Sequence, residues 1–296
     1  MPPERPVADA TVPLRVMVLC GRSPRHLYVA NTLCRAADVL AIVQETGSDV
    51  SWRSLAKKLR PDGLARKAWR WLRDRRRYTG QGEARFFFGD GAPRLDRSDL
   101  VREVPHINHA DVVALARELQ PDLLAVFGTS LIRGELLEQG RLGITNLHGG
   151  LSPEYRGADC TFWALYNGEP HKVGCTLHWI DAGIDTGGLI AHVSPDVRDD
   201  DDELTLFWRA VRTSADVYAQ LLRRLAAGER FGQVQPHKGR LYQVKQRGWR
   251  HERRLERLLR GGMLRGLNLA TRVTWFPAQA GSQRTVARAA APVVTR

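Results

Sequence analysis

Two short stretches of this chain predict its fold and its chemistry. They are Asn146-Leu147-His148-Gly149-Gly150-Leu151-Ser152-Pro153-Glu154-Tyr155-Arg156-Gly157 and Asp181-Ala182-Gly183-Ile184-Asp185-Thr186-Gly187. The apolar pattern that leads into the first stretch predicts a strand over 143–148, and residues two apart on a strand share one face. Asn146 and His148 are therefore expected on the same side of a sheet. The second stretch predicts a glycine-bounded loop that presents Asp185.

An amide, an imidazole and a carboxylate at loop ends suit acyl transfer to an amine. The Asn146 amide and a protonated His148 can donate hydrogen bonds to an oxyanion, while an anionic Asp185 keeps the imidazole charged. Neither Ser152 nor Cys160 lies in a Gly-x-Ser-x-Gly nucleophile elbow, so direct attack by the amine is the simpler hypothesis. Taken singly, each residue of the trio also suits an ordinary structural role at a turn or strand end.

The same residues resemble a known family. The Asn-x-His strand end, the Leu-Ser-Pro-x-Tyr-Arg-Gly turn, the helix at Phe162-Trp163-Ala164-Leu165 and the Asp-x-Gly-x-Asp-Thr-Gly loop are similar to those of the folate-dependent formyltransferases. The resemblance covers roughly 14–227 and is dense over 121–190. It implies that Asn146, His148 and Asp185 form the catalytic set and that N10-formyltetrahydrofolate is the donor.

The resemblance also implies where the donor binds. Gly128-Thr129-Ser130-Leu131-Ile132 follows a predicted strand, and the backbone of Ser130, Leu131 and Ile132 is expected to hold the pterin ring. Leu151 and Pro153 of the turn are assigned to the same cofactor site. Asp181 either shapes its loop or touches the pterin. His178 lies on a probable strand and is interpreted as structural.

The pattern along the chain predicts an α/β fold with an open, mostly parallel, Rossmann-like sheet. Apolar runs at 14–20, 39–43, 122–127 and 143–148 predict buried strands, and 110–119 predicts a helix. We expect a flexible N-terminus over 1–13 and a catalytic domain over 14–227 with a basic helical insertion at 51–80. A short, mainly helical basic extension over 228–270 and a disordered tail over 271–296 should follow.

Composition adds further expectations. The 296 residues are 43% hydrophobic, enough for one full core, and no apolar run reaches the length of a membrane span. The four cysteines are scattered without a Cys-x-x-Cys pair or a histidine at ligand spacing, so neither a metal site nor a disulfide framework is predicted. The first strand is not followed by Gly-x-Gly-x-x-Gly, which disfavours a nicotinamide cofactor. A cytoplasmic location is expected.

The charge is unevenly placed. Residues 51–80 carry a net charge of +9 and residues 230–296 carry +13, so the remainder carries −9 within a total of +13. Basic segments interleaved with leucines can bind an anionic membrane surface, here the inner face of the membrane, or nucleic acid. They can equally be solvated helices whose leucines pack on the core.

The predicted activity is formyl transfer to a primary amine, above all that of a nucleotide-linked amino sugar or a secondary-metabolite intermediate. The extension is too short and too helical for the tRNA-binding β-barrel that the resemblance would require of a methionyl-tRNA formyltransferase. That activity stays an alternative because of the basic tail. Hydrolysis of formyltetrahydrofolate and a non-catalytic folate- or RNA-binding role are the others.

Overall fold

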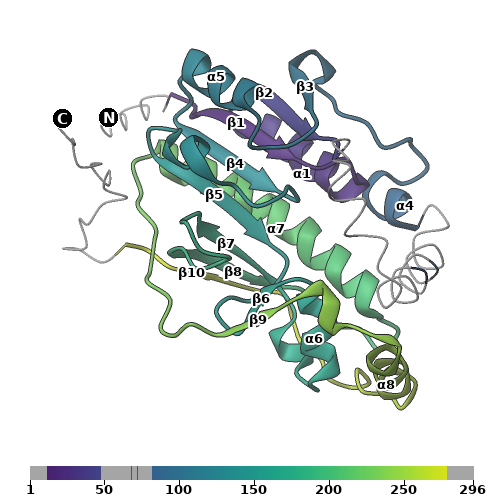
Figure 1. Cartoon of the computed structure of the whole chain (residues 1–296). Helices are drawn as coiled ribbons and strands as arrows, with labels where there is room; N and C mark the ends of the chain where they lie inside the picture. The colour runs from purple at the N-terminus through teal and green to yellow at the C-terminus, as the bar shows by residue number, and fades with distance from the viewer. Residues whose placement is uncertain (1–11, 48–67, 69–71, 73–81, 279–296) are drawn as a thin grey trace, which may run out of the picture.

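The fold places the carboxyl ends of two parallel strands, β4 (Leu123–Phe127) and β5 (Gly143–His148), next to each other at one edge of the main sheet. A computed structural model describes residues 12–47, 68, 72 and 82–278, and its main sheet has the strand order β10-β8-β7-β5-β4-β1-β2-β3 (Figure 1). The strands of this sheet are β1 (Arg15–Cys20), β2 (Asp38–Glu45), β3 (Val101–Val104), β4 (Leu123–Phe127), β5 (Gly143–His148), β7 (Cys175–Trp179), β8 (Leu189–Ser194) and β10 (Arg272–Trp275). A second sheet pairs β6 (Tyr155–Gly157) with β9 (Arg240–Tyr242).

The main sheet changes strand direction beside β5. The strands from β3 to β5 are parallel, whereas β7, β8 and β10 pair in antiparallel fashion. The predicted open, mostly parallel α/β sheet is confirmed. Its predicted strands are found as β1, β2, β4 and β5, with the bounds of β5 as expected.

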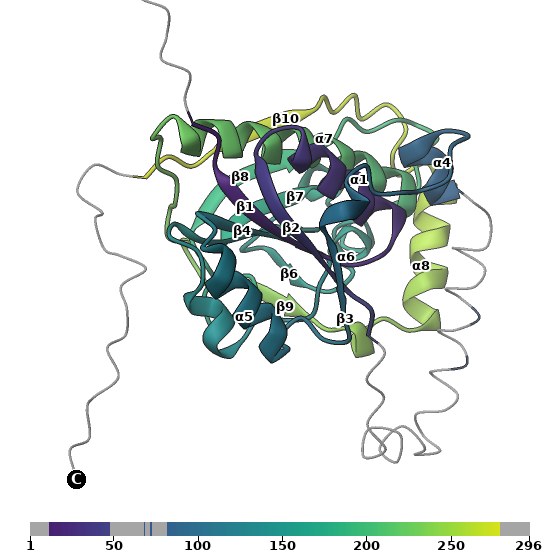
Figure 2. The same ribbon diagram turned by 90° about the horizontal axis from the view of Figure 1, so that it is seen from above.

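Helices cover both faces of the sheet (Figure 2). They are α1 (Pro24–Cys34), α4 (Gly82–Phe88), α5 (Ala110–Leu119), α6 (Cys160–Tyr166), α7 (Glu203–Ala226) and α8 (Trp249–Arg260), and the short 3-10 turns are η1 (Ser98–Leu100), η2 (Gly134–Glu138), η3 (Pro170–Lys172) and η4 (Val244–Gln246). Val16 and Val18 of β1 pack in the core cluster that includes α1 and α7, whereas Met17 and Leu19 pack in the cluster that includes α5. Burial on both faces explains why the strand is a continuous apolar run.

Helix α7 supports the two strands that carry the site. Its Tyr218 is fully buried, and the hydroxyl lies 2.7 Å from the Thr145 hydroxyl of β5. The same hydroxyl accepts a hydrogen bond from the Val126 amide of β4 at 3.2 Å and lies 3.1 Å from the Thr145 carbonyl oxygen. A buried hydroxyl therefore satisfies backbone groups of both strands at the edge where they end.

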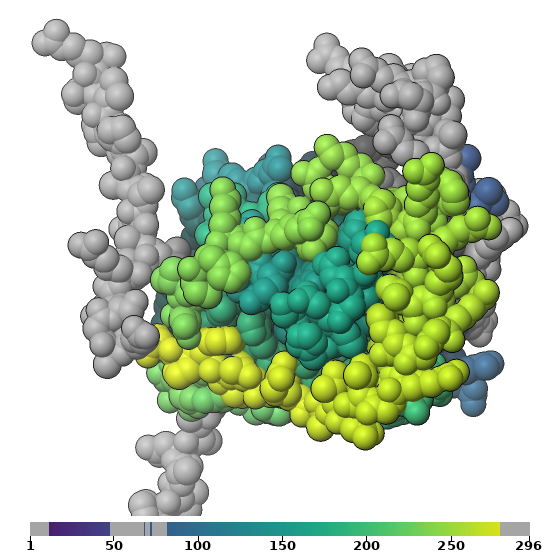
Figure 3. Space-filling view, turned by 90° about the horizontal axis from the view of Figure 1, so that it is seen from below, coloured from purple at the N-terminus to yellow at the C-terminus, as the bar shows by residue number. Residues whose placement is uncertain are grey.

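The C-terminal segment is built into the domain, contrary to the expectation of a separate extension and tail. Strand β10 pairs with β8 and extends the main sheet, so the predicted disorder from Thr271 is wrong for 272–275. The segment's alternating residues suit an edge strand, and Trp275 packs against the core. Strand β9 pairs with β6 of the catalytic region. Figure 3 shows this segment, coloured green to yellow, wrapped around the central teal part of the chain.

Three of the predicted regions fall largely outside the described residues. They are the N-terminus, of which 12–13 are described, the insertion at 51–80, of which 68 and 72 are described, and the end of the chain beyond 278. Among the described helices, none combines the length and apolar character needed to cross a bilayer.

Arg247 anchors the C-terminal segment. Its side chain is 3% exposed, and its guanidinium contacts carboxylates from three elements: Asp159 at 2.9 Å, Glu203 at 2.9 Å and Glu252 at 2.6 Å. The guanidinium carbon also lies 3.8 Å from the centroid of the Phe162 ring. Because Asp159 precedes α6 and Glu203 begins α7, one cation joins the segment to the starts of both helices.

Replacing Arg247 tests whether this anchor stabilises the fold. Arg247→Met leaves three partly buried carboxylates without their cation, so the free energy of unfolding should fall by about 2–4 kcal/mol. Arg250→Met is the matched control, because Arg250 is exposed and its loss should change stability by less than about 0.5 kcal/mol. Urea denaturation of both variants measures the difference. Equal stabilities would show that the segment does not depend on the Arg247 cluster.

Candidate active site

A cavity of about 600 Å³ opens where β4 and β5 end. Four stretches of the chain line this cavity. Two of them start at the ends of β4 and β7 and continue into the loops that follow, over 126–132 and from His178 to Asp185. The others are 146–149 with 157–158, at the ends of β5 and β6, and 241–244, from β9 onward. Ligands in open α/β sheets bind at the carboxyl ends of the strands. The predicted catalytic trio lies in this cavity.

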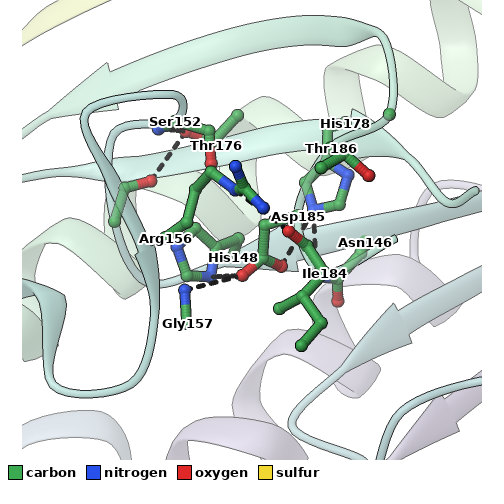
Figure 4. Close-up of polar contacts among 12 residues, drawn as sticks. Asn146, His148, Ser152, Arg156, Gly157, Thr176, His178, Ile184, Asp185 and Thr186 are labelled. Atoms are coloured by element: carbon green, nitrogen blue, oxygen red, sulfur yellow. Dashed lines mark hydrogen bonds and ion pairs between the residues drawn. The ribbon is translucent and has the colours of Figure 1, made fainter. Parts of the chain in front are cut away.

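The three residues of the trio lie together. Asn146 and His148 share one face of β5, as expected from their spacing. The Nδ1 atom of His148 lies 3.5 Å from Oδ2 of Asp185, although the two residues are 37 positions apart in the sequence. Figure 4 shows Asp185 between His148 and His178. The geometry therefore unites two sequence motifs into one site.

Donors surround the Asp185 carboxylate. The Gly157 amide donates to Oδ2 at 2.9 Å, and Nε2 of His178 lies 3.5 Å from Oδ1. Burial alone would raise the pKa of this carboxyl, but His148, His178 and the Gly157 amide together hold the pKa well below its usual range. Asp185 is therefore a buried anion at neutral pH. It has a left-handed φ of 51°.

Three side chains, those of Asp181, Arg156 and Gln235, form hydrogen bonds with the loop that carries Asp185. Oδ1 of Asp181 accepts hydrogen bonds from the Gly183 amide at 2.9 Å and the Thr186 hydroxyl at 2.5 Å, so Asp181 shapes the loop while also lining the cavity. The Arg156 guanidinium donates to the Ile184 carbonyl at 3.0 Å and also to the Lys238 carbonyl. The Gln235 amide donates to the carbonyls of Asp185 at 2.8 Å and Gly187 at 2.9 Å.

His148 differs from the sequence expectation in its protonation. Its Nε2 donates to the Tyr155 carbonyl at 3.0 Å, because a carbonyl oxygen can only accept. Burial lowers the pKa of His148 below its ordinary value, and Asp185 opposes this shift without reversing it. The direction of this shift favours a neutral imidazole at pH 7 over the resting imidazolium that the sequence analysis expects.

His178 was interpreted as structural, yet it lines the cavity and contacts two members of the trio. Its Nδ1 donates to the Trp179 carbonyl at 2.7 Å, and its Nε2 lies 3.2 Å from the Asn146 amide nitrogen. This contact with the Nε2 atom of His178 constrains the orientation of the Asn146 amide. No local pattern in the sequence indicates this contact, because it arises from the antiparallel pairing of β5 with β7, which places His178 opposite Asn146.

The predicted donor-binding residues divide into two groups. Ser130, Leu131, Ile132 and Asp181 line the cavity. Leu151 and Pro153 do not line it: Leu151 is buried beside Gly174, and Pro153 packs against Gly239. The cavity wall at 241–244 was not predicted, because its proximity depends on the pairing of β9 with β6.

Cys160 lies close to the site but is a poor nucleophile. Its sulfur is 3.6 Å from Nε2 of His148. Burial raises the pKa of this thiol well above its ordinary value, so the reactive thiolate is scarce at neutral pH. Among the described residues, no group of histidine, cysteine, aspartate and glutamate side chains could hold a metal ion.

Part of the chain is similar to known proteins. Residues 96–222 match the formyl transferase family. The methionyl-tRNA formyltransferase of Chlorobium chlorochromatii (strain CaD3) is 32% identical over 127 residues, which are 43% of this chain and 40% of that protein. The methionyl-tRNA formyltransferase of Geobacter metallireducens (strain ATCC 53774 / DSM 7210 / GS-15) is 40% identical over 120 residues, covering 40% of this chain and 38% of that protein. The chain thus matches about two fifths of the length of these curated relatives.

A solved structure shares the fold over a longer span. The sugar N-formyltransferase from Shewanella sp FDAARGOS_354 superposes with a TM-score of 0.53 at 15% identity, covering 90% of this chain and 98% of that chain. The likeness is one of fold. With the family match, it confirms the resemblance that the sequence motifs indicate.

The neutral state of His148 can be tested by titration. In NMR spectra of ¹³C,¹⁵N-labelled histidines, we expect the His148 pKa below the ordinary value of about 6.5, and lower still in Asp185→Asn because the carboxylate favours the imidazolium. A His148→Gln variant assigns the signal. His192, whose pKa burial also lowers but which does not contact Asp185, is the internal control and should titrate unchanged. A His148 pKa above 6.5 would restore the resting imidazolium.

Proposed function

Because residues 96–222 match the formyl transferase family, we propose that this chain transfers a formyl group from N10-formyltetrahydrofolate to a primary amine. We propose further that the amine belongs to a nucleotide-linked amino sugar or a related secondary-metabolite intermediate. The observation that carries the proposal is the buried His148–Asp185 pair beside Asn146 in one cavity. This arrangement provides an amide donor, a proton acceptor and a fixed anion within one site.

The cavity suits a folate donor. Its volume of about 600 Å³ lies within the usual range for small-molecule sites, roughly 300–1,000 Å³. Val126, Phe127, Leu131 and Ile132 give one wall an apolar character suited to a flat pterin ring. When bound, the donor supplies an activated formyl carbon. The wall at 241–244 lies across the cavity's remaining side and is the natural boundary for the amine acceptor.

Each residue of the trio then has a distinct task. Asn146, oriented by His178, donates a hydrogen bond to the formyl oxygen as that oxygen gains negative charge. The neutral His148 receives a proton from the attacking amine nitrogen on Nδ1 and returns it to the departing N10 nitrogen. Asp185 stabilises the imidazolium between these two transfers. The new N–C bond forms as the old one breaks, and the proton count balances without a covalent enzyme intermediate.

A methionyl-tRNA formyltransferase activity is the second candidate. It is supported by the curated relatives and by the exposed cations of α8, which include Arg250, Arg253, Arg254, Arg257 and Arg260. The apolar side of α8 faces inward, with Leu255 at 3% exposure and Leu259 packed against the core. This orientation favours a phosphate-rich partner at α8 over insertion of the helix into an anionic membrane, which needs an exposed apolar face.

Acceptor identity can be tested with a panel. The purified chain is given N10-formyltetrahydrofolate with a UDP- or dTDP-linked amino sugar, with methionyl-tRNA, or with no acceptor, and tetrahydrofolate release and the formylated product are both measured. We expect turnover with an amino sugar and little release without an acceptor. Formylation of methionyl-tRNA alone would make the second candidate correct. Equal release in every mixture would identify a hydrolase, and donor binding without release would identify a non-catalytic folate-binding protein.

The catalytic assignment predicts a graded set of variants. His148→Asn and Asp185→Asn should each reduce turnover by on the order of a hundredfold or more, because each removes part of the proton-transfer pair. Asp181→Asn is the matched control: it changes a carboxylate of the same loop that bonds only loop groups, so its loss should be smaller. Steady-state kinetics and tetrahydrofolate binding are measured for all three. An equal loss in Asp181→Asn would point to loop order as the origin of the effect.

A further inference from the structure

We propose that Glu45 and Asn108, two residues outside the trio, are positioning residues that hold the donor-binding loop in its binding conformation. The loop is 128–133, which follows β4 and contributes the cavity wall at Ser130, Leu131 and Ile132. We call the two side chains and their bonds to this loop the Glu45–Asn108 clamp. The identity of the ligand rests on the function proposed above, whereas the clamp itself rests on its own contacts.

Glu45 is the last residue of β2, and its carboxylate joins two loops at the carboxyl edge of the sheet. Oε2 accepts a hydrogen bond from the Ser130 amide at 2.5 Å, and Oε1 accepts one from the Ile107 amide at 2.9 Å. Hydrogen bonds to a charged acceptor are stronger than those between neutral groups. One carboxylate therefore fixes the loop after β4 relative to the loop after β3.

Asn108 holds the next part of the same loop. Its amide nitrogen donates to the Leu131 carbonyl at 2.8 Å, and its amide oxygen accepts from the Arg133 amide at 2.7 Å. This two-bond arrangement resembles the pairing that a neighbouring strand would offer. Ile107 and Asn108 are adjacent, so Glu45 also secures the backbone that presents Asn108.

The clamp provides hydrogen-bond partners for backbone groups of the loop that have none in a helix or sheet. Residues 128–133 lie between β4 and η2 without a strand partner, so the amides of Ser130 and Arg133 and the carbonyl of Leu131 would otherwise depend on water. Leu131 is 37% exposed in the cavity wall and can pack on a ligand only if its backbone is fixed. Ordering this loop before the ligand arrives removes part of the entropy that binding would otherwise lose.

The trio does not depend on the clamp. His148 and Asp185 are held by the Tyr155 carbonyl, the Gly157 amide and His178, none of which contacts Glu45 or Asn108. Loss of the clamp should therefore weaken donor binding while leaving the proton-transfer pair intact. This separation distinguishes a positioning role from general damage to the site.

The variants Asn108→Ala, Asn108→Asp and Glu45→Gln test the clamp. Asn108→Asp keeps the acceptor for the Arg133 amide but places a carboxylate oxygen against the Leu131 carbonyl, so its effect should be at least as large as that of Asn108→Ala. Glu103→Gln is the matched control for Glu45→Gln, because it changes an exposed glutamate of the adjacent strand that has no contact with the loop. Calorimetric binding of tetrahydrofolate is measured for each protein. We also measure KM for the formyl donor, kcat at saturating donor, and amide hydrogen exchange over 128–133 without ligand.

We expect Asn108→Ala and Glu45→Gln to weaken tetrahydrofolate binding and raise donor KM by about three- to tenfold, with kcat within about twofold. Exchange over 128–133 should accelerate without ligand, while Glu103→Gln matches the parent. Parent-like exchange and affinity in both variants would overturn the clamp, and so would a loss confined to kcat. If the parent fails to bind tetrahydrofolate, the proposed donor is wrong. The exchange measurement still decides whether the clamp holds the loop, since it needs no ligand.

Discussion

A charged carboxylate can be buried only if donors replace the water it loses, and the centre of this molecule is arranged around that constraint at Asp185. The Gly157 amide at the end of β6 donates to this carboxylate, and the imidazoles of His148 from β5 and His178 from β7 each lie 3.5 Å from one of its oxygens. These three groups come from three separate strands. The change from parallel to antiparallel pairing beside β5 brings β7 next to it, so the sheet topology itself creates the place for this anion.

The C-terminal segment, residues 228–278, also contacts the region around Asp185. Gly157 pairs with Tyr242 of β9, and residues 241–244 continue as a wall of the cavity. Gln235 and the Lys238 carbonyl connect the same segment to the Asp185 loop, either directly or through Arg156. Arg247 joins it to the starts of α6 and α7. A segment that composition describes only as basic thus forms part of the cavity wall and contacts the Asp185 loop.

Patterns of apolar residues predicted the bounds of those strands and helices whose formation depends mainly on residues close together in the sequence. The strand over 143–148 and the helix over 110–119 have the predicted bounds, because apolar periodicity fixes both. The neutral state of His148 could not be predicted in this way, since it depends on burial by residues far along the chain. The same reason applies to His178, β9 and β10, whose roles follow from pairing partners that are between 32 and 85 positions away.

The order of these elements along the chain has a consequence for synthesis on the ribosome. Domains fold from the N-terminal side as residues emerge at about 5–20 per second. A nascent chain that has emerged through α7 already contains Asn146, His148 and Asp185, but it lacks the wall at 241–244 and the edge strand β10. Its β8 edge is then unpaired, and the apolar side of α6 that packs with Leu255 and Leu264 is uncovered. Until residues 240–275 emerge, the nascent chain therefore contains the trio but lacks the strands and the helix that cover these surfaces.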